Sequence, residues 1–353
     1  MHQARVPDRQ LRVGPQLVDH IGHADLGGSG GHHQVDGRAD RHGGGGGGIL
    51  ADDAAGVDWT LYFTNRGSAD TPVLENLRAL DAVVRLGLGA APVVRRLKGS
   101  TCAADDWLPF DSALPPGARI EFGAVNGRSS ADSPFWNLDW GRGGLIAAVG
   151  WSGQWRGSVE HDAGGEVRVR AGLERARLKL RPGESIRMPR ILLLPWAGGD
   201  AERASNLFRR TMRRRVMPRI DGVPVAPPIA HLSTSFYELN ATTEASVLAH
   251  LESLRGLGFE MLWLDAYWTR DGFPAGMGHY GFPLERVEPR DRFPRGLKPI
   301  GEAVRAAGLK FLMWFEPERV HPGTMIAKEH PEWVISPAGD GSGLFDLGNA
   351  EAR

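Results

Sequence analysis

Carboxylate and indole side chains follow two apolar runs in the C-terminal third of the chain. The run at residues 259–264 leads into Asp265, and the run at 310–315 leads into Glu316. Carboxylates accept hydrogen bonds from hydroxyl groups, and indole faces cover the apolar C–H side of a sugar ring. We therefore expect a binding site for a neutral sugar, formed by these residues: Asp265, Trp268, Trp314, Glu316, Glu318 and Arg319.

Glycoside hydrolysis by two carboxyl groups is the reaction that this combination favours, with the pair drawn from Asp265, Glu316 and Glu318. A second interpretation stays open, in which Glu316 and Glu318 are partners of Arg319 or hold the backbone. A tryptophan at the end of a strand, such as Trp314, can also belong to the core rather than to a sugar platform. The pattern alone does not choose between these readings.

A strand, helix, strand, helix, strand pattern positions these residues. Segments 229–237, 259–264 and 310–315 are apolar enough for buried parallel strands. Asn240 or Thr242 can cap the first intervening helix. The two helical faces are these sets: Val247, Leu248, Leu251 and Leu254, then Leu297, Ile300 and Val304. Because residues 235–243 contain no glycine, a phosphate-binding loop of an open sheet is absent, and we expect a barrel with its chemistry at the carboxyl ends of the strands.

The segment from Val57 to about residue 220 is predicted to be a β-sandwich. Trp59, Leu61 and Phe63 alternate with smaller or polar residues, and a turn is expected at 126–127. Residues 178–188 resemble a hairpin around a Pro-Gly turn. A helix is expected at 202–217, and its five arginines at 209, 210 and 213–215 suggest either a nucleic-acid contact or a solvated face, of which we favour the second. Residues 217–228 are expected to be a linker.

Residues 1–50 are predicted to be a disordered, glycine- and histidine-rich tail. They contain no Phe, Trp or Tyr, and residues 43–48 are all glycine. Ordering such a run loses backbone entropy without burying apolar surface. His32, His33 and Asp36 are possible metal ligands, but they have no helical or strand template, and we expect no metal site there.

The overall composition limits the possible partners. The chain has 353 residues, with 42 basic and 42 acidic side chains and one cysteine. A zero net charge gives no electrostatic case for nucleic acid or an anionic membrane, and one cysteine cannot form an internal disulfide. No apolar run reaches the length of a membrane span, and no signal peptide is recognised, so we expect a cytoplasmic protein. His279 and His321 are expected in loops without a partner, and we assign them no catalytic role.

Five blocks in the last third, in this order, are similar to the α-galactosidases of glycoside hydrolase family 36. They are WLDAYW (263–268), RFPRGLKP (292–299), MWFEPERV (313–320), EHPEWV (329–334) and LFDLGN (344–349). Upstream, DTPVLEN (70–76), GRSS (127–130) and GWSGQW (150–155) resemble the N-terminal β-supersandwich of that family. The resemblance implies an α+β multidomain fold, with a supersandwich over 51–222 and an incomplete (β/α)8 TIM barrel of about three strands over 223–353.

The resemblance also implies the reaction, which is retaining hydrolysis of terminal α-1,6-linked galactose in oligosaccharides of the melibiose and raffinose type, without a metal or other cofactor. Asp265 is expected to hold sugar hydroxyls and Trp314 to line the galactose pocket. The family's nucleophile and acid/base aspartates are expected beyond Arg353, so this chain is predicted to be inactive alone. The alternatives are a raffinose-type galactosyltransferase and a non-catalytic sugar-binding module. Full-length members commonly form tetramers.

Two positions differ from the family pattern. The segment 231–237 has no tryptophan, where members often carry one at the end of the first barrel strand. The block from Asp265 to Trp268 has one acid and Tyr267, where many members have two aspartates followed by glycine. We therefore expect the sugar subsite to be shaped differently.

Overall fold

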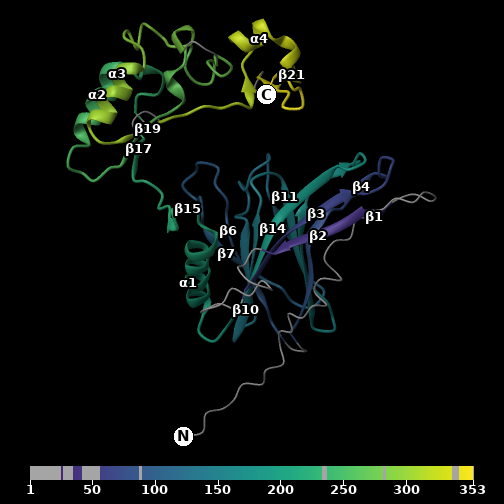
Figure 1. Ribbon diagram of the computed structural model, residues 1–353. Coiled ribbons are helices and arrows are strands. Elements are labelled where there is room, and N and C mark those ends of the chain that lie inside the picture. The colour runs from purple at the N-terminus through teal and green to yellow at the C-terminus, as the bar shows by residue number, and fades with distance from the viewer. Residues whose placement is uncertain are drawn as a thin grey trace. The chain divides into compact units, whose positions relative to one another are not determined.

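The computed structural model describes residues 25–26, 35–41, 56–86, 90–232, 237–280, 284–335 and 342–352. The chain divides into two compact units, Met1–Pro224 and Val225–Arg353 (Figure 1). The first unit consists mostly of antiparallel sheet, and the second combines a short parallel sheet with helices. Each unit has its own core.

Two antiparallel sheets make up most of the first unit. The larger has seven strands, in the order β2 (Val35–Arg41), β3 (Val57–Asn65), β14 (Ser185–Ala197), β10 (Gly143–Gly150), β9 (Phe135–Asp139), β6 (Val93–Leu97) and β7 (Pro109–Ala113). The smaller has four, in the order β5 (Arg78–Arg85), β12 (Glu166–Leu173), β11 (Trp155–His161) and β8 (Arg119–Gly123). A minor sheet joins β1 (Asp25–Leu26), β4 (Leu74–Glu75) and β13 (Arg177–Leu178).

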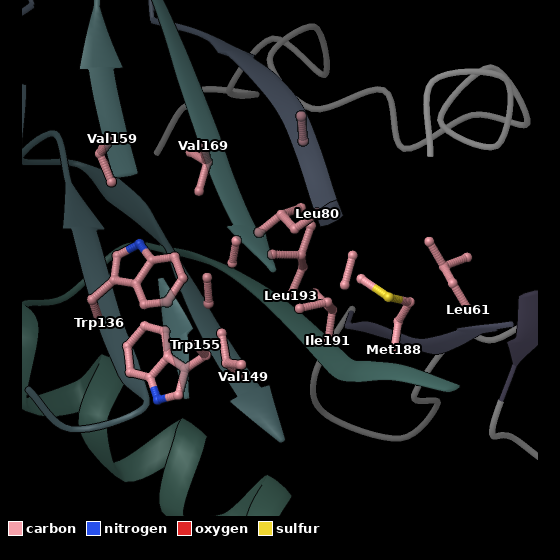
Figure 2. Packing of buried hydrophobic residues seen from close by; sticks show 14 of the residues in the cluster. Leu61, Leu80, Trp136, Val149, Trp155, Val159, Val169, Met188, Ile191 and Leu193 are labelled. Carbon is pink, nitrogen blue, oxygen red and sulfur yellow. The ribbon is translucent and has the colours of Figure 1, made fainter. Parts of the chain in front are cut away.

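The core of the first unit lies between the two large sheets. Figure 2 shows Trp136 from β9 close to Trp155 from β11, so side chains of the two sheets meet. The ring of Phe122 on β8 packs edge-on against Trp136, with 4.7 Å between ring centroids. Trp59, Leu61 and Phe63 on β3 are all buried in this core, as their alternation predicted.

The predicted hairpin at 178–188 is wrong, although its turn is present. Leu178 ends β13, which pairs with β4 of the minor sheet, whereas β14 begins at Ser185 and pairs with β3 and β10. The reason is that the backbone at Leu180 finds its partners at Thr71, which donates its N–H to the Leu180 carbonyl at 2.9 Å. The turn therefore carries the chain from one sheet to another.

The predicted turn at 126–127 is confirmed. Asn126 and Gly127 both adopt positive φ, at 56° and 73°, and an antiparallel bridge joins the flanking Val125 and Arg128. Positive φ at both central positions is typical of a tight hairpin turn, and asparagine and glycine tolerate it best.

One helix packs on the outer face of the larger sheet. Helix α1 (Ala201–Thr211) begins at Asp200, whose carboxylate accepts the N–H of Arg203 at 2.9 Å, and lies beside the sheet in Figure 1. Its Ala204 packs on Ile146, Leu194 and Trp196. The predicted helix to residue 217 continues as a π-helical turn, η2 (Met212–Val216), and the hairpin β15 (Arg219–Ile220) and β16 (Val223–Pro224) stands where a linker was expected.

Most of the predicted tail, 1–50, lies outside the described residues. His32 and His33 are in the part that is not described. The described parts are strands β1 and β2, and β2 pairs with β3 from Val35 opposite Asn65 to Arg41 opposite Trp59. Backbone pairing at the edge of a sheet does not require aromatic side chains. The tail as a whole stays a prediction.

Three parallel strands and two helices form the centre of the second unit. The strand order is β17 (Ala230–Leu232), β18 (Met261–Leu264) and β19 (Lys310–Met313), and α2 (Glu244–Ser253) and α3 (Lys298–Ala306) lie side by side (Figure 1). The predicted apolar faces pack together, since Val247, Leu251 and Leu254 share one core with Ile300 and Val304. The strands are shorter than the predicted segments, and residues 233–236 lie outside the described part of the chain.

The expected helix cap at Asn240 or Thr242 is wrong. Thr243 caps α2: its hydroxyl accepts the N–H of Ser246 at 3.1 Å, while the Ser246 hydroxyl accepts the N–H of Thr243 at 3.0 Å. A 3-10 turn, η3 (Leu239–Ala241), precedes the cap and delays the helix start. Asn240 is thereby left to form hydrogen bonds elsewhere.

A second small sheet follows β19. Its strands are β20 (Arg319–Val320), β22 (Gly343–Phe345) and β21 (Val334–Ile335), and helix α4 (Met325–Glu329) lies between β20 and β21 in sequence. Three further 3-10 turns are η4 (Ala266–Trp268), η5 (Leu284–Arg286) and η6 (Pro331–Trp333). Within the described ranges, no helix is both long and apolar enough to cross a membrane.

Candidate functional site

Asp265 and Trp314 stand next to each other at the carboxyl ends of two paired strands. Leu264 on β18 lies opposite Met313 on β19, and the N–H of Trp314 donates to the Leu264 carbonyl at 3.0 Å. The parallel register therefore continues for one more residue and brings Asp265 and Trp314 to the same edge. Both side chains are partly buried, so each keeps some exposed surface. The register thus places an aspartate next to a tryptophan at this edge of the sheet.

Trp268 is fully buried and belongs to the core of the second unit. Its Nε1 donates to the backbone carbonyl of Trp314 at 2.8 Å, and its ring packs edge-on against Phe315 with 5.1 Å between centroids. In this fold the indole supports the end of β19 through that hydrogen bond, and neither face of its ring is exposed to a ligand.

Glu316 and Arg319 form a two-pronged ion pair. The Arg319 Nη2 donates to Glu316 Oε2 at 2.6 Å, and the Nε donates to Oε1. The guanidinium also lies over the ring of Phe273, with Cζ 5.5 Å from the ring centroid. Phe273 in turn meets Trp314 edge-on at 6.0 Å and Tyr267 at 5.9 Å. The interpretation of Glu316 as a partner of Arg319 is thus the one that the structure supports.

Glu318 takes a different position from Glu316. Its side chain is exposed, and its backbone carbonyl accepts the N–H of Phe345 at 2.8 Å, next to the pairing of β20 with β22. The two glutamates are therefore not an equivalent pair: Glu316 is engaged by a cation, and Glu318 faces solvent.

Trp314, Glu316, Arg319 and Phe273 form a cluster of contacting side chains, and Tyr280 lies next to its Glu316. The backbone N–H of Glu316 donates to the Tyr280 hydroxyl oxygen at 3.3 Å, and the ring lies 6.0 Å from that of Phe315. Burial raises the pKa of Tyr280 to about 12, and the neighbouring Glu316 charge adds to the effect. Burial, together with the charge of Asp265, also raises the pKa of Tyr267. Both phenols stay neutral near pH 7 and can donate or accept hydrogen bonds.

Asn240 and Arg292 hold the backbone around the cluster, and sequence reasoning assigned no such role to either. Asn240 donates to the carbonyl of Phe273 and accepts its N–H, both at 2.8 Å. Arg292 donates to the carbonyls of Tyr267 at 2.6 Å and Thr269 at 2.8 Å. The position of Arg292 in the RFPRGLKP block is the one signal that could have singled it out.

A cavity of about 460 Å³ opens beside Asn240. It is lined by the following residues: Asn240, Arg270, Asp271, Gly272, Glu288, Pro289, Arg290, Asp291 and Arg292. Charges of both signs line it, and Arg290 already pairs with Glu288 at 3.0 Å. The cavity is therefore polar without a strong net charge.

His279 is not the unpartnered loop residue that the sequence suggested. It is buried, its Nε2 lies 2.9 Å from Asp271 Oδ2, and its Nδ1 accepts the N–H of Met325 at 3.4 Å. Because Nδ1 accepts, Nε2 carries the proton and donates to Asp271. His279 thereby ties the loop after β18 to the start of α4. His321 contributes its backbone, which donates to the Met277 carbonyl at 2.7 Å.

Among the described side chains, no group of three or more His, Cys, Asp or Glu residues is arranged to hold a metal ion. The cluster is built from hydrogen-bond donors, acceptors and aromatic faces. Groups of these kinds can form hydrogen bonds and stacking contacts with a polar, uncharged molecule.

Comparisons with known proteins point to one family. Residues 225–343 match the family model described as Melibiase. The α-galactosidase Mel36A of Lactobacillus acidophilus is 26% identical over 217 residues, which are 58% of this chain and 28% of that protein. α-Galactosidase 2 of Pediococcus pentosaceus is 29% identical over 192 residues, 53% of this chain and 25% of that protein. The matched part thus spans about a quarter of the length of these curated relatives.

Solved structures share the fold. The GH36 α-galactosidase AgaA from Geobacillus stearothermophilus superposes with a TM-score of 0.72 at 17% identity, over 94% of this chain and 51% of that one. A variant of AgaA in complex with raffinose gives a TM-score of 0.69 at 20% identity, over 84% of this chain and 42% of that one. At this level of identity the likeness concerns the fold alone, and it includes the sheet-rich first unit.

Proposed function

We propose that the second unit, most of which matches the Melibiase family model, binds the terminal α-linked galactose of neutral oligosaccharides of the melibiose and raffinose type. Asp265 accepts hydrogen bonds from ring hydroxyls, and the Trp314 indole covers the C–H face of the sugar. Arg319, oriented by Glu316, donates to a hydroxyl. The observation that carries this proposal is the pairing of β18 with β19, which sets Asp265 beside Trp314.

The proposed fold of the second unit is the beginning of a (β/α)8 barrel. Three parallel strands with helices in the connections, and with the candidate residues at the carboxyl ends of β18 and β19, support it. The proposed domains are a tail at 1–50, a β-supersandwich at 51–222 and the barrel part at 223–353. A cytoplasmic location and assembly of the full-length form into oligomers complete the proposal.

For residues 1–353 we propose binding without hydrolysis. Retaining hydrolysis needs a nucleophilic carboxylate and an acid/base carboxyl group about 5 Å apart. Family resemblance assigns both to later barrel strands, and among the described residues Glu316 is engaged by Arg319. Neither Glu316 nor Glu318 matches a catalytic motif of the family, so the galactose would be held but not cleaved.

The ligands of related proteins support the choice of sugar. AgaA variants from Geobacillus stearothermophilus have been crystallised in complex with raffinose and with stachyose. The polar cavity beside Asn240 has room for further sugar units next to the cluster. We therefore propose that the galactose unit binds at Asp265 and Trp314 and that the remaining units extend toward this cavity.

The binding proposal is tested by isothermal titration of the full chain with raffinose, using maltotriose as a sugar without galactose. Asp265→Asn and Trp314→Ala are each expected to weaken raffinose binding at least about tenfold, the effect of one lost charge-assisted contact or stacking partner. Glu252→Gln, an exposed change on α2, serves as the control and is expected to leave binding unchanged. Equal affinity of wild type and both site variants would refute the assignment.

The absence of hydrolysis is tested with p-nitrophenyl α-galactoside and the same preparation. No release of p-nitrophenol above the buffer rate is expected. Release that is lost in Asp265→Asn would show a complete catalytic site and overturn this part of the proposal, while leaving the binding assignment in place.

A further inference from the structure

An exposed tryptophan is displayed on a stiff loop at the edge of the larger sheet. The loop connects β6 to β7, and the side chain of Asp106 organises it: its carboxylate accepts hydrogen bonds from Ser100 Oγ at 2.6 Å, Thr101 N at 2.9 Å and Cys102 N at 3.0 Å. These hydrogen bonds, the Ser100 hydroxyl first, lower the pKa of Asp106 to about 2. The carboxylate therefore stays charged near neutral pH and can accept all three hydrogen bonds.

Trp107 follows directly and holds an unfavourable position. Its side chain is 55% exposed, and its φ of 64° lies in the region that costs a non-glycine residue strain. A large, mostly exposed indole thus stands at a strained backbone position. Such strain concentrates at positions that serve a binding function.

A groove of about 870 Å³ begins two residues further along the chain. Helix α1 forms one side, and β6, β7 and β9 form the floor. Its apolar lining includes Leu97, Pro109, Phe110, Phe135, Phe208 and Met212. The groove exists because α1 covers the outer face of the sheet at Ile146, Leu194 and Trp196 and leaves the part toward β7 open. Its volume is in the range of sites for small organic ligands.

Two of the arginines that line the groove form ion pairs, and Arg209 and Glu202 on α1 add one charge of each sign to the lining. Arg95 pairs with Asp139 at 2.9 Å and also with Asp111. Arg96 pairs with Asp132 at 3.1 Å and lies over the Phe110 ring, with Cζ 4.6 Å from the centroid. An anionic ligand finds no free cation at these positions, whereas hydroxyl groups can donate to the carboxylates and accept from the guanidinium groups.

We propose that this groove is a second, non-catalytic binding site for a neutral oligosaccharide, with two stacking surfaces: Phe110, which lines the groove, and the exposed Trp107 on the loop that leads into it. Fixed aromatic faces beside neutralised polar pairs suit a molecule that has alternating C–H faces and hydroxyl groups. A purely apolar partner would remove solvent from these ion pairs without offering them hydrogen bonds, which is costly. The inference rests on the proposed function only for the kind of sugar, which is galactose-containing.

The test follows the indole N–H signals of the ¹⁵N-labelled full chain while stachyose is added. Trp107→Phe and Trp314→Phe assign the two signals of interest. We expect both signals to move in wild type, and the Trp107 signal to keep moving in Asp265→Asn. Phe110→Ala should raise the stachyose concentration for half-maximal movement of the Trp107 signal at least fivefold. Tyr237→Ala, which removes an exposed aromatic ring of the second unit, should change nothing.

Each other outcome has a definite meaning. If only the Trp314 signal moves, the groove inference fails and the proposed function stands. If only the Trp107 signal moves, the groove binds sugar and the proposed site at Asp265 fails. If stachyose moves neither signal, both fail. Movement of the Trp107 signal by a proline-rich peptide but not by stachyose would assign the groove to protein recognition and overturn the inference. The thermal unfolding midpoint of Phe110→Ala, followed by circular dichroism, shows whether that variant is folded. Calorimetry of stachyose binding to Trp107→Ala provides an independent check of the role of Trp107.

Discussion

The indole Nε1 of Trp268 donates a 2.8 Å hydrogen bond to the backbone carbonyl of Trp314, so a fully buried residue after β18 supports the residue at the end of β19. The two tryptophans look alike in the sequence, since each lies close to the end of an apolar run. In the fold their positions differ: Trp268 packs in the core, and Trp314 stays partly exposed beside Asp265.

Replacing Trp268 should therefore affect both stability and binding. Trp268→Phe keeps most of the apolar volume but removes the donor, and the unpaired Trp314 carbonyl should lower the free energy of unfolding by about 1–3 kcal/mol. Trp268→Ala should cost about 3–5 kcal/mol. Urea unfolding measures both changes. Raffinose binding to the folded fraction of Trp268→Phe should weaken, and unchanged affinity would show that Trp314 does not need this support.

The pair between Glu316 and Arg319 should contribute more than an ordinary surface ion pair. Its side chains are 14% and 30% exposed, and two hydrogen bonds join them. A double-mutant cycle with Glu316→Gln and Arg319→Met, followed by urea unfolding, should give a coupling free energy of about 1 kcal/mol after allowance for solvent screening.

A matched control is available on the same unit. Arg255 and Glu252 form a pair with the same i,i+3 spacing, but their side chains are 75% and 67% exposed. The corresponding cycle should give a value close to zero. Equal coupling in the two cycles would mean that burial and the Phe273 ring add nothing to the Glu316 pair.

Gly272 should tolerate a side chain less well than other glycines of the same conformation. Its φ is 66°, and a Cβ there would collide with the Asn240 carboxamide that holds Phe273. Gly308 has a φ of 74° and open space around it. Gly272→Ala should therefore lower the free energy of unfolding more than Gly308→Ala. The only expected cost of Gly308→Ala is the backbone strain of a positive φ, about 1 kcal/mol. In an Asn240→Ala background the excess should disappear, and urea unfolding of the four variants decides this.

Tyr280 should ionise late and at a cost to stability. Its pKa is raised from 10 to about 12, first by burial and then by the Glu316 charge. A raised pKa means that the neutral form stabilises the fold fully below pH 10, and that this contribution is lost as the pH rises toward 12. Phenolate absorbance near 295 nm should show a late phase that is missing in Tyr280→Phe and starts earlier in Glu316→Gln. A late phase that persists in Tyr280→Phe would contradict the assignment.

The sequence predicted the elements whose pattern is local. Val247, Leu251, Ile300 and Val304 were placed on helix faces because apolar spacing depends on the helix alone, and the structure confirms them. Trp59, Leu61 and Phe63 were recognised in the same way. The family resemblance, carried by short blocks with fixed order, is confirmed by the Melibiase match.

The parts that failed depend on distant partners. The segment 178–188 has every local sign of a hairpin, but Thr71 captures its backbone from 109 residues away. The cap of α2 moved to Thr243 because a 3-10 turn precedes it. The choice between Glu316 and Glu318 as the partner of Arg319 depends on backbone direction at Pro317, which no spacing rule supplies. The assignment of these residues to sugar binding stays a prediction.

The pairing of β3 with β14 sets the order in which the first unit can be completed during synthesis. Asp58 Oδ2 on β3 accepts a hydrogen bond from Arg190 Nε on β14 at 2.7 Å, and 132 positions in the sequence separate the two residues. At ribosomal rates of about 5–20 residues per second, β3 waits roughly 7–26 seconds for this partner. Until then its inward edge is open, and the cost of closing so long a loop must be met before any pairing is gained. The nascent chain is thus most exposed to aggregation and to chaperone binding before Ala197 has been made, and the second unit begins to emerge only as that interval ends.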